Sequence, residues 1–469
     1  ALRVEVTDRV ISSDYVGNGV EWDPYDEAEA WGAEVSDADW AKLSERLDFM
    51  RPGYVRCMIN SPYRYYDAAT GRYDRMRNLA SLRRLLQYCQ DNGITVAYGE
   101  YNPPTWAMKD SQQWVEMSVD YLHFLVCDLG FDCIRHFIIF NEPDGSWAST
   151  NGDYDLWCSM AQRFDAEMAR YPDLKRKVSL AAPDVVMSYK NPASEYDTAG
   201  WVARSAQDLG AQIGIYDVHA YPGQHEVRSG AYAEKLRRIR AEVPAGKKLI
   251  LGEAGYKYSA PEDSLLKAEY DRRVAGHPFT KGSDCNMLCY DYFYGLDMPL
   301  LAMEVMNNGL SGVAAWMLDD AMHSNGDSGR TEDVKIWGMW NILGEEVFGD
   351  ASQEELRPWY YTWSLMCRCF PAGCDILVCE VPQREGVRVA AARKDGSYSV
   401  AAVNFSQEPC ALEIVLPGDF AGGVLYRYTE SDRACDDRGL PVPCECGIEG
   451  RSFRTTLPAE SFVLLTNIE

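Results

Sequence analysis

Two apolar stretches of this sequence indicate its fold. They are His136-Phe137-Ile138-Ile139-Phe140-Asn141-Glu142-Pro143 and Lys248-Leu249-Ile250-Leu251-Gly252-Glu253. Each contains a short continuous apolar run, which is typical of one buried strand, and in each a glutamate stands two residues after that run. We therefore expect Glu142 and Glu253 to lie at the carboxyl ends of two buried strands.

Working outward from these two stretches, similar runs alternate with segments of helical periodicity. The eight predicted strands are Val16–Trp22, Tyr54–Asn60, Ile94–Tyr101, His136–Glu142, Lys177–Pro183, Ile213–Tyr221, Lys248–Glu253 and Gly312–Leu318. Most of them start about forty residues apart, and helices such as Asn78–Asn92 and Gln112–Gly130 lie between them. Eight strand–helix repeats at this spacing predict an α/β fold of the (β/α)8 TIM barrel type.

A doubly wound open sheet is the competing fold. It is disfavoured because no Gly-x-Gly-x-x-Gly motif follows the first strand, where Val16-Gly17-Asn18-Gly19-Val20 continues as strand. The longer seventh interval contains Tyr256–Ser264 and Gly276–Asn286. In a barrel this insertion is a loop over the mouth, where it can act as a lid or as a subsite wall.

The pattern changes after about Pro371. Short runs separated by turn signals follow, namely Ile376–Glu380, Val387–Arg393, Tyr398–Phe405, Ala411–Leu416, Gly423–Thr429, Ser452–Leu457 and Ser461–Thr466. They predict an all-β sandwich. We expect the barrel to span residues 13–370 and the sandwich residues 371–469. An N-terminal strand, residues 1–12, is expected to cross over to the sandwich.

Charge and cysteine content restrict the partners and the location. The 469 residues carry 46 Lys plus Arg against 71 Asp plus Glu, a net charge of −25, which disfavours nucleic-acid and membrane-surface partners. No apolar run is long enough for a membrane span. The 15 cysteines, an odd and scattered set, favour reduced thiols and a cytoplasmic location. The pairs Cys367/Cys369 and Cys444/Cys446 lack the four-ligand zinc spacing, so we expect no metal and no cofactor.

Catalytic groups of a barrel lie at the carboxyl ends of its strands, so the polar residues expected there are candidates for catalysis. They include Arg56, Glu100, Tyr101, Asn141, Glu142, Asp217, His219, Tyr221, Glu253 and Trp316. A single strand-terminal Glu often only caps a helix. Glu142 and Glu253, however, are expected on strands four and seven, facing each other across the mouth. That arrangement suits acid/base and nucleophilic catalysis on one glycosidic bond.

At these positions the sequence resembles the clan A retaining glycoside hydrolases, which include cellulases, β-xylosidases and glucocerebrosidase-like enzymes. The resemblance rests on Asn141-Glu142-Pro143 and Glu253, with Arg56, His219-Ala220-Tyr221 and Trp316 in the expected order. It covers about residues 14–325. Strand three ends in Gly99-Glu100-Tyr101-Asn102, where several cellulase-like members have a histidine, so that part of the sugar site is not transferable.

The resemblance implies a β-glycosidase without metal or cofactor, acting on an oligosaccharide or glycoside. Glu253 is then the nucleophile and Glu142 the acid/base. The resemblance also implies that Asn141 bonds the sugar 2-OH, that Arg56, His219 and Tyr221 hold Glu253, and that Trp316 forms a floor under the sugar. From their place on expected loops, Trp22, Tyr101 and Trp106 are either subsite contacts or loop structure.

Other interpretations stay open. The barrel can be catalytically inactive and serve as a carbohydrate-binding protein, because a fold does not fix a function. A metal-dependent hydrolase needs His-x-His clusters at strand ends, and the sequence has none. Individually, Trp316 and His219 can be core packing, and Arg56 can be a structural ion-pair partner. Asp23, Trp147, Asp319 and Asp320 lie on expected loops and are either subsite contacts or loop structure.

Overall fold

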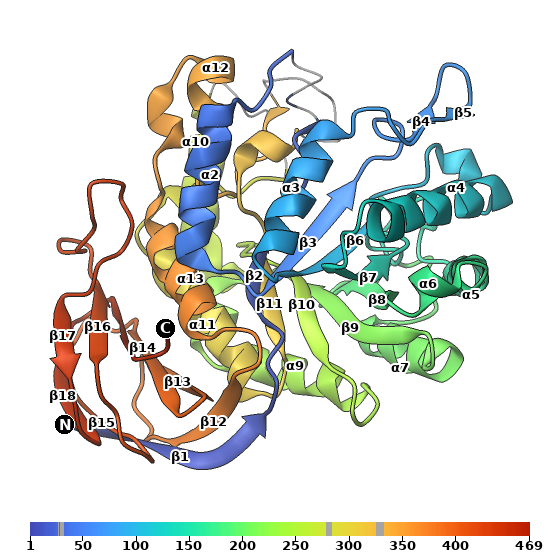
Figure 1. Ribbon diagram of the computed structural model, residues 1–469. Coiled ribbons are helices and arrows are strands. Elements are labelled where there is room, and N and C mark those ends of the chain that lie inside the picture. The colour runs from blue at the N-terminus through green and yellow to red at the C-terminus, as the bar shows by residue number, and fades with distance from the viewer. Residues whose placement is uncertain (27, 29–31, 278–283, 325–332) are drawn as a thin grey trace.

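The computed structural model describes residues 1–26, 28, 32–277, 284–324 and 333–469. The chain forms a barrel surrounded by helices and a large β-sheet at one side of it (Figure 1). Among the described residues, no helix is both long and apolar enough to cross a membrane. All fifteen cysteines are described, and none of them forms a disulfide.

Eight parallel strands close into a ring in the order β10-β11-β2-β3-β6-β7-β8-β9. Their bounds are β2 (Gly17–Glu21), β3 (Tyr54–Ile59), β6 (Thr95–Glu100), β7 (Ile134–Ile138), β8 (Ser179–Val186), β9 (Ile213–Ala220), β10 (Leu249–Ala254) and β11 (Gly312–Ala315). The prediction of a (β/α)8 barrel is confirmed. The open-sheet alternative is wrong, because β11 pairs with β2 and closes the ring.

Helices cover the outside of the barrel. The longer ones are α2 (Asp37–Met50), α3 (Ala80–Asp91), α4 (Gln112–His123), α5 (Tyr154–Ala169), α7 (Thr198–Leu209), α9 (Ala231–Ala241), α10 (Ser264–Gly276), α11 (Tyr294–Asn307) and α13 (Pro358–Cys369). Short ones are α6 (Pro172–Lys175), α8 (Gln224–Arg228) and α12 (Gly344–Phe348). Local sequence explains their start points: Ser36 caps α2 through the amide of Asp39, and the Asp39 side chain returns to the Ser36 amide.

The barrel interior holds its own small apolar cluster. It consists of Tyr54, Met58, Ala97, Ile138, Ala181, Ile215, Ile250 and Ala314, all buried. Successive inward positions on a strand are two residues apart, so Ile215 of β9 is followed inward by Asp217 and His219. The apolar filling therefore gives way to buried polar groups toward the carboxyl ends of the strands.

The second sheet contains nine strands in the order β17-β16-β19-β14-β13-β12-β1-β15-β18. They are β1 (Leu2–Ser12), β12 (Asp375–Glu380), β13 (Val387–Lys394), β14 (Ser397–Asn404), β15 (Cys410–Val415), β16 (Gly423–Tyr428), β17 (Glu445–Ile448), β18 (Ser452–Leu457) and β19 (Ser461–Thr466). The sheet folds over a second apolar core that includes Val4, Leu412, Leu425 and Leu465. The N-terminal strand β1 lies inside this sheet, antiparallel to β12 and parallel to β15.

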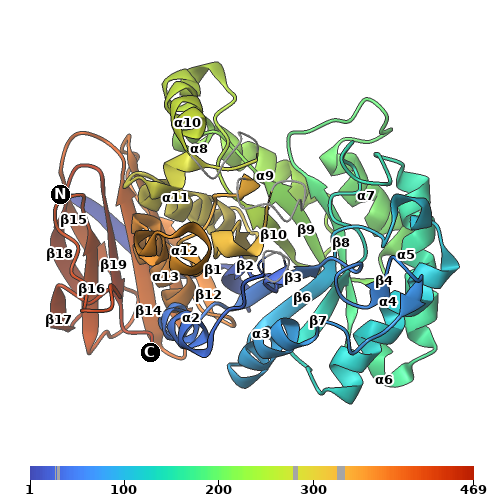
Figure 2. The same ribbon diagram turned by 90° about the horizontal axis from the view of Figure 1, so that it is seen from above.

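The sheet rests against the helices of one side of the barrel, and Figure 2 shows it beside α11 and α13. Tyr292 stacks on Tyr428 with ring centroids 4.5 Å apart, and the Tyr428 hydroxyl donates to the Tyr292 carbonyl over 2.6 Å. The predicted insertion after β10 contains α10, and its residues 278–283 lie outside the described part of the chain.

Candidate active site

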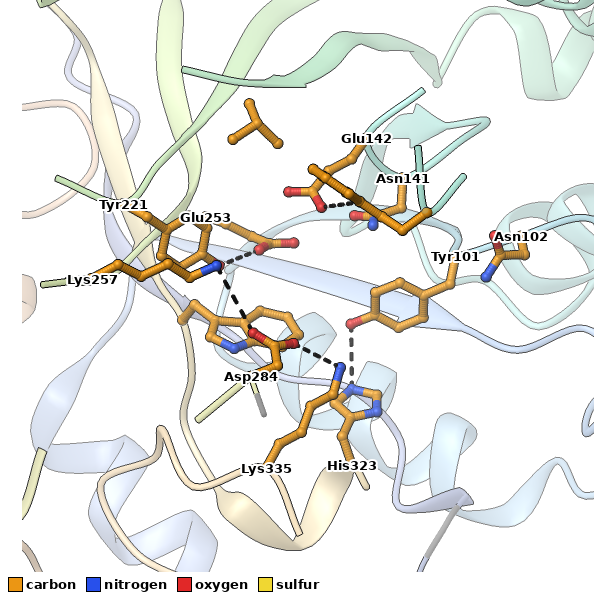
Figure 3. A pocket seen from close by; sticks show the side chains of 13 residues that line it. Tyr101, Asn102, Asn141, Glu142, Tyr221, Glu253, Lys257, Asp284, His323 and Lys335 are labelled. Carbon is orange, nitrogen blue, oxygen red and sulfur yellow. Dashed lines mark hydrogen bonds and ion pairs between the residues drawn. The ribbon is translucent and has the colours of Figure 1, made fainter. Parts of the chain in front are cut away.

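A cavity of about 430 Å³ opens at the carboxyl ends of the barrel strands (Figure 3). Thirteen residues line it: Tyr101, Asn102, Asn141, Glu142, Trp147, Val186, Tyr221, Glu253, Lys257, Asp284, Trp316, His323 and Lys335. Six of the ten site residues expected from the sequence are in this lining, and all thirteen come from the barrel and its loops.

Glu142 and Glu253 converge in this cavity. A carboxylate oxygen of each and Nδ1 of His219 all lie within 4.8 Å of one another. Glu253 is on β10, whereas Glu142 follows β7 in the loop. Two carboxyl groups at this separation can act on opposite sides of one bond.

The loop that carries Glu142 has an unusual backbone. Glu142 has φ 49° and Asp184, at the neighbouring strand β8, has φ 62°. Both values lie in the left-handed region, which residues with a Cβ rarely adopt. The amide of Glu142 donates to the carbonyl of Asp184 over 3.1 Å, so the two unusual conformations support each other.

Glu253 is 5% exposed and is held by two donors. Arg56 Nη1 is 2.7 Å from its Oε2, and the Tyr221 hydroxyl donates to its Oε1 over 2.5 Å. Burial raises the pKa of Glu253, while the charges of His219 and Arg56 act in the opposite direction. Both contacts orient the carboxylate and stabilise its ionised form.

Glu142 is held from two other directions. Trp147 Nε1 donates to Oε1 over 2.9 Å, and His219 Nδ1 lies 2.7 Å from Oε2. The other nitrogen of His219 lies 2.9 Å from Oδ1 of Asp184. Burial opposes a charged His219, but the neighbouring carboxylates of Asp184 and Glu253 raise its pKa well above the ordinary value. A protonated His219 therefore donates from Nδ1 to Glu142 and from Nε2 to Asp184.

Arg56 joins these groups beneath the cavity and is fully buried. Its Nη1 also pairs with Glu21, and its Nη2 donates to Asn141 Oδ1 over 2.7 Å and to Asp184 Oδ2 over 2.8 Å. A buried guanidinium needs such partners because leaving it unpaired is costly. Burial alone would raise the pKa of Asp184, but Arg56 and His219 hold it below its ordinary value. The bond to Arg56 uses the Asn141 oxygen and leaves its amide nitrogen as a donor.

Trp316 and Tyr101 also line the cavity. The Trp316 ring lies parallel to that of His323, with centroids 5.9 Å apart. The Tyr101 hydroxyl donates to Asp23 Oδ2 over 2.5 Å and lies 3.3 Å from His323 Nε2. Since Trp316 is only 5% exposed, the surface it offers is the part that faces the cavity.

Trp22 and Trp106 are expected site residues that do not line the cavity. Trp22 is buried among aromatic rings, and its ring centroid lies 6.1 Å from that of Trp40 and 5.7 Å from that of Tyr88. Neighbouring positions of a strand point to opposite sides, so at the end of β2 Glu21 faces inward and Trp22 outward. Trp106 is 54% exposed on the turn of residues 106–108 and faces solvent.

Two acidic residues of the loops, Asp319 and Asp320, bind other loop residues instead of lining the cavity. Asp319 accepts from the amides of Ala321 and Ile342, and Asp320 pairs with Arg357 at 2.5 Å. Six residues of the site were not expected from the sequence: Glu21 and Asp184, which pair with Arg56, and Lys257, Asp284, His323 and Lys335, which line the cavity. Glu21 is the last residue of β2, so the strand-end rule that identified Glu142 applies to it as well. Asp184 follows Pro183, the last residue of the predicted fifth strand.

Among the described residues, three clusters have a donor set that can hold a metal ion. They are Glu142/His219/Glu253, His123/Cys127/Asp173 and Asp39/Glu346/Glu354. In the cluster of Glu142, His219 and Glu253, the side chains already contact Arg56, Tyr221, Trp147 and Asp184. Protein groups therefore satisfy the polar atoms that a metal ion would need.

No protein-family model and no curated protein sequence matches the chain. Solved structures do. A GH30 endoxylanase from Clostridium papyrosolvens C71 superposes with a TM-score of 0.64 at 15% identity, covering 100% of both chains. A GH39 β-xylosidase from Caulobacter crescentus gives 0.61 at 13%, covering 99% of both. A family 51 α-L-arabinofuranosidase from Bifidobacterium longum gives 0.63 at 11%, again covering 99% of both. The fold is thus that of the clan A glycoside hydrolases, as the sequence resemblance predicted.

Proposed function

We propose that this protein is a retaining glycoside hydrolase that cleaves a β-glycosidic bond by double displacement. The observation that carries the proposal is the approach of carboxylate oxygens of Glu142 and Glu253 to within 4.8 Å of each other. Retaining enzymes place their two carboxyl groups roughly 5–5.5 Å apart, whereas inverting enzymes need about 6.5–9.5 Å to admit a water.

In the first step, a carboxylate oxygen of Glu253 attacks the anomeric carbon of the sugar. Glu142 gives its proton to the glycosidic oxygen, which leaves with the aglycone. His219 Nδ1, 2.7 Å from Glu142 Oε2, holds the Glu142 side chain in position for this transfer. The bond that forms is an ester between Glu253 and the sugar, and the bond that breaks is the glycosidic C–O bond.

In the second step, Glu142 is a carboxylate and removes a proton from water. The water oxygen attacks the anomeric carbon, and Glu253 leaves as a carboxylate. Arg56 and Tyr221 stabilise that leaving carboxylate, because both donate to it directly. In this proposal Asn141 bonds the sugar 2-OH and Trp316 provides an apolar surface under the ring, which is supported by the place of both residues in the cavity lining.

The proposal is tested with a panel of aryl glycosides, both neutral and charged. We expect turnover of at least one member with retention, so that proton NMR detects the product in the substrate's anomeric configuration first. Glu253→Ala and Glu142→Ala should each lower the rate on a nitrophenyl substrate by about 10²-fold or more. The exposed Glu195→Ala is the matched control and should retain the wild-type rate.

Three outcomes would contradict the proposal: no turnover of any glycoside, inversion of configuration, or loss of less than tenfold in both variants. The first, combined with measurable oligosaccharide binding by calorimetry, would instead identify a carbohydrate-binding protein on an inactive barrel.

A further inference from the structure

Three side chains with metal-binding atoms meet on the outside of the barrel, away from the cavity. They are His123, the last residue of α4, Cys127 in the π-helical turn Phe124–Asp128 that follows it, and Asp173 of α6. An imidazole nitrogen, the thiol sulfur and a carboxylate oxygen all lie within 4.8 Å of one another. Asp173 comes 50 residues after His123, so only the fold brings the set together.

The topology places this cluster at the end of the barrel opposite the cavity. α4 follows β6 and runs back to the start of β7 at Ile134, and α6 ends shortly before β8 starts at Ser179. The end of α4 and the whole of α6 therefore lie near the amino ends of the strands, and α6 packs against the π-helical turn (Figure 1). In (β/α)8 barrels this end serves stability, whereas the carboxyl ends carry catalysis.

Two of the three side chains already point at each other. Nε2 of His123 lies 3.0 Å from Oδ2 of Asp173. The centroid of the Tyr171 ring lies 4.6 Å from that of the His123 ring, and the Tyr171 hydroxyl donates to Asp120 over 3.3 Å. These contacts hold the imidazole in the orientation that directs Nε2 toward the cluster.

The backbone brings Cys127 onto the same face as His123. Residues four positions apart are neighbours on a helix surface. At this point the helix widens into a π-helical turn, in which the Leu129 amide donates to the Phe124 carbonyl over 2.9 Å. Such single turns inside a helix occur frequently at functional sites.

The donor set suits zinc. Zn²⁺ binds thiolate, imidazole and carboxylate at about 2.0–2.3 Å in a tetrahedron, which separates neighbouring ligand atoms by roughly 3.3–3.6 Å. The distance of 3.0 Å between His123 and Asp173 has to widen only slightly to admit the ion. Thiolate and imidazole favour zinc over magnesium and calcium. The Asp173 side chain is 48% exposed, so water has access to the fourth position.

The other two clusters in the described part of the chain offer no sulfur. Around the active-site cluster, protein groups already satisfy the polar atoms. In the cluster of Asp39, Glu346 and Glu354 all ligands are carboxylates, and Asp39 returns to the amide of Ser36 as part of a helix cap. Beside Cys127, by contrast, the nearby ammonium of Lys177 is paired with Asp132 at 2.9 Å.

We propose that His123, Cys127 and Asp173 bind one Zn²⁺ ion, with water as the fourth ligand. On binding, the Cys127 thiol loses its proton to solvent and a sulfur–zinc bond forms, while the contact between His123 and Asp173 is replaced by two bonds to the ion. The ion links the end of α4 to α6 and thereby stabilises the fold. The proposal is independent of the proposed glycosidase function.

Cobalt(II) is the probe, because a thiolate bound to Co²⁺ gives an intense charge-transfer absorption in the near ultraviolet. The full chain is stripped of metal with EDTA under reducing conditions and titrated with Co²⁺. We expect this absorption to saturate at one equivalent and to disappear when Zn²⁺ displaces the cobalt. Zn²⁺ at roughly 100 times Kd should raise the melting temperature by about 2–4 °C, and Mg²⁺ should not.

Variants of the ligands assign the signal to this site. Cys127→Ser should abolish the charge-transfer absorption. His123→Gln and Asp173→Asn should each weaken zinc binding by at least about tenfold, since changes even in the groups around metal ligands cost that much. Cys435→Ser is the matched control, because Cys435 is an exposed free thiol outside all three clusters. It should keep both the absorption and the stabilisation by zinc.

No thiolate absorption in the wild type, or an absorption that survives in Cys127→Ser, would overturn the proposal. So would a zinc affinity that His123→Gln leaves unchanged. The melting temperature of each metal-free variant shows whether it folds. If Cys127→Ser does not fold, His123→Gln decides, because it keeps the thiol and removes the nitrogen ligand.

Discussion

The amide of Glu142 donates a hydrogen bond of 3.1 Å to the carbonyl of Asp184, and both residues have left-handed backbone conformations. Asp184 also contacts His219 and Arg56 through its side chain. A residue of strand β8 thus determines where the carboxylate that follows strand β7 lies. This relationship connects the two proposed catalytic groups, because the same Arg56 holds Glu253.

Asp184→Asn should therefore affect catalysis without touching the substrate. Removing a buried carboxylate from Arg56 and His219 should lower the free energy of unfolding by roughly 3 kcal/mol. Loss of the negative charge lowers the pKa of His219, so His219 releases its proton at a lower pH. We expect the basic limb of the pH–rate profile to move to lower pH, measured on the best aryl glycoside. A lower rate with an unshifted profile would mean that Asp184 only supports the fold.

Azide distinguishes the two carboxylates. In Glu142→Ala, a dinitrophenyl glycoside should still react with Glu253, since a good leaving group needs little acid assistance. The intermediate then accumulates, and azide should accelerate its breakdown by more than about tenfold, giving a β-glycosyl azide. Glu253→Ala should give an α-azide or no product. The reverse pattern would exchange the two assigned roles.

Trp147→Phe removes the donor to Oε1 of Glu142 and keeps a ring beside Tyr189, whose centroid is 4.9 Å away. We expect kcat/KM to fall about three- to tenfold for a poor phenol leaving group and little for dinitrophenol, because the bond assists only the acid. The exposed Trp106→Phe serves as the control. Equal losses for both leaving groups would assign Trp147 to substrate binding alone.

The buried carboxyl of Asp144 makes the stability of the fold depend on pH. Burial, followed by the charge of Glu142, raises its pKa from 3.8 to about 8. The folded protein therefore holds a proton that the unfolded chain releases between these values, so stability falls as pH rises from about 4 to about 8. Asp144→Asn should show a smaller decrease in melting temperature over that window. The exposed Asp437→Asn should match the wild type. An unchanged decrease in Asp144→Asn would show that other groups cause it.

Chelation tests the assignment to metal-independent chemistry. Activity should survive excess EDTA, since the proposed steps use only protein groups and water. Loss of activity in EDTA that zinc restores would favour the metal-dependent alternative.

The barrel could be predicted from the sequence because each buried strand is a local apolar run and each repeat has a similar length. The same rule identified Glu142 and Glu253, since each lies two residues after the last apolar residue of such a run. It assigned Trp22 to the site and omitted Glu21, an error of one position. In a strand, one position changes the side on which a side chain lies.

The sequence alone thus determined the strands, their order along the chain and the two carboxylates at their ends. Only the tertiary structure decided which distant groups surround those carboxylates. Arg56 contacts residues 35 to 197 positions away, and Lys335 faces a cavity wall to which Asp284 also belongs. Local periodicity reports burial and secondary structure, whereas these contacts depend on the closure of the barrel and on long loops. Closure brings the ends of β2, β7, β8 and β10 together around one buried guanidinium on β3, and no local pattern encodes that.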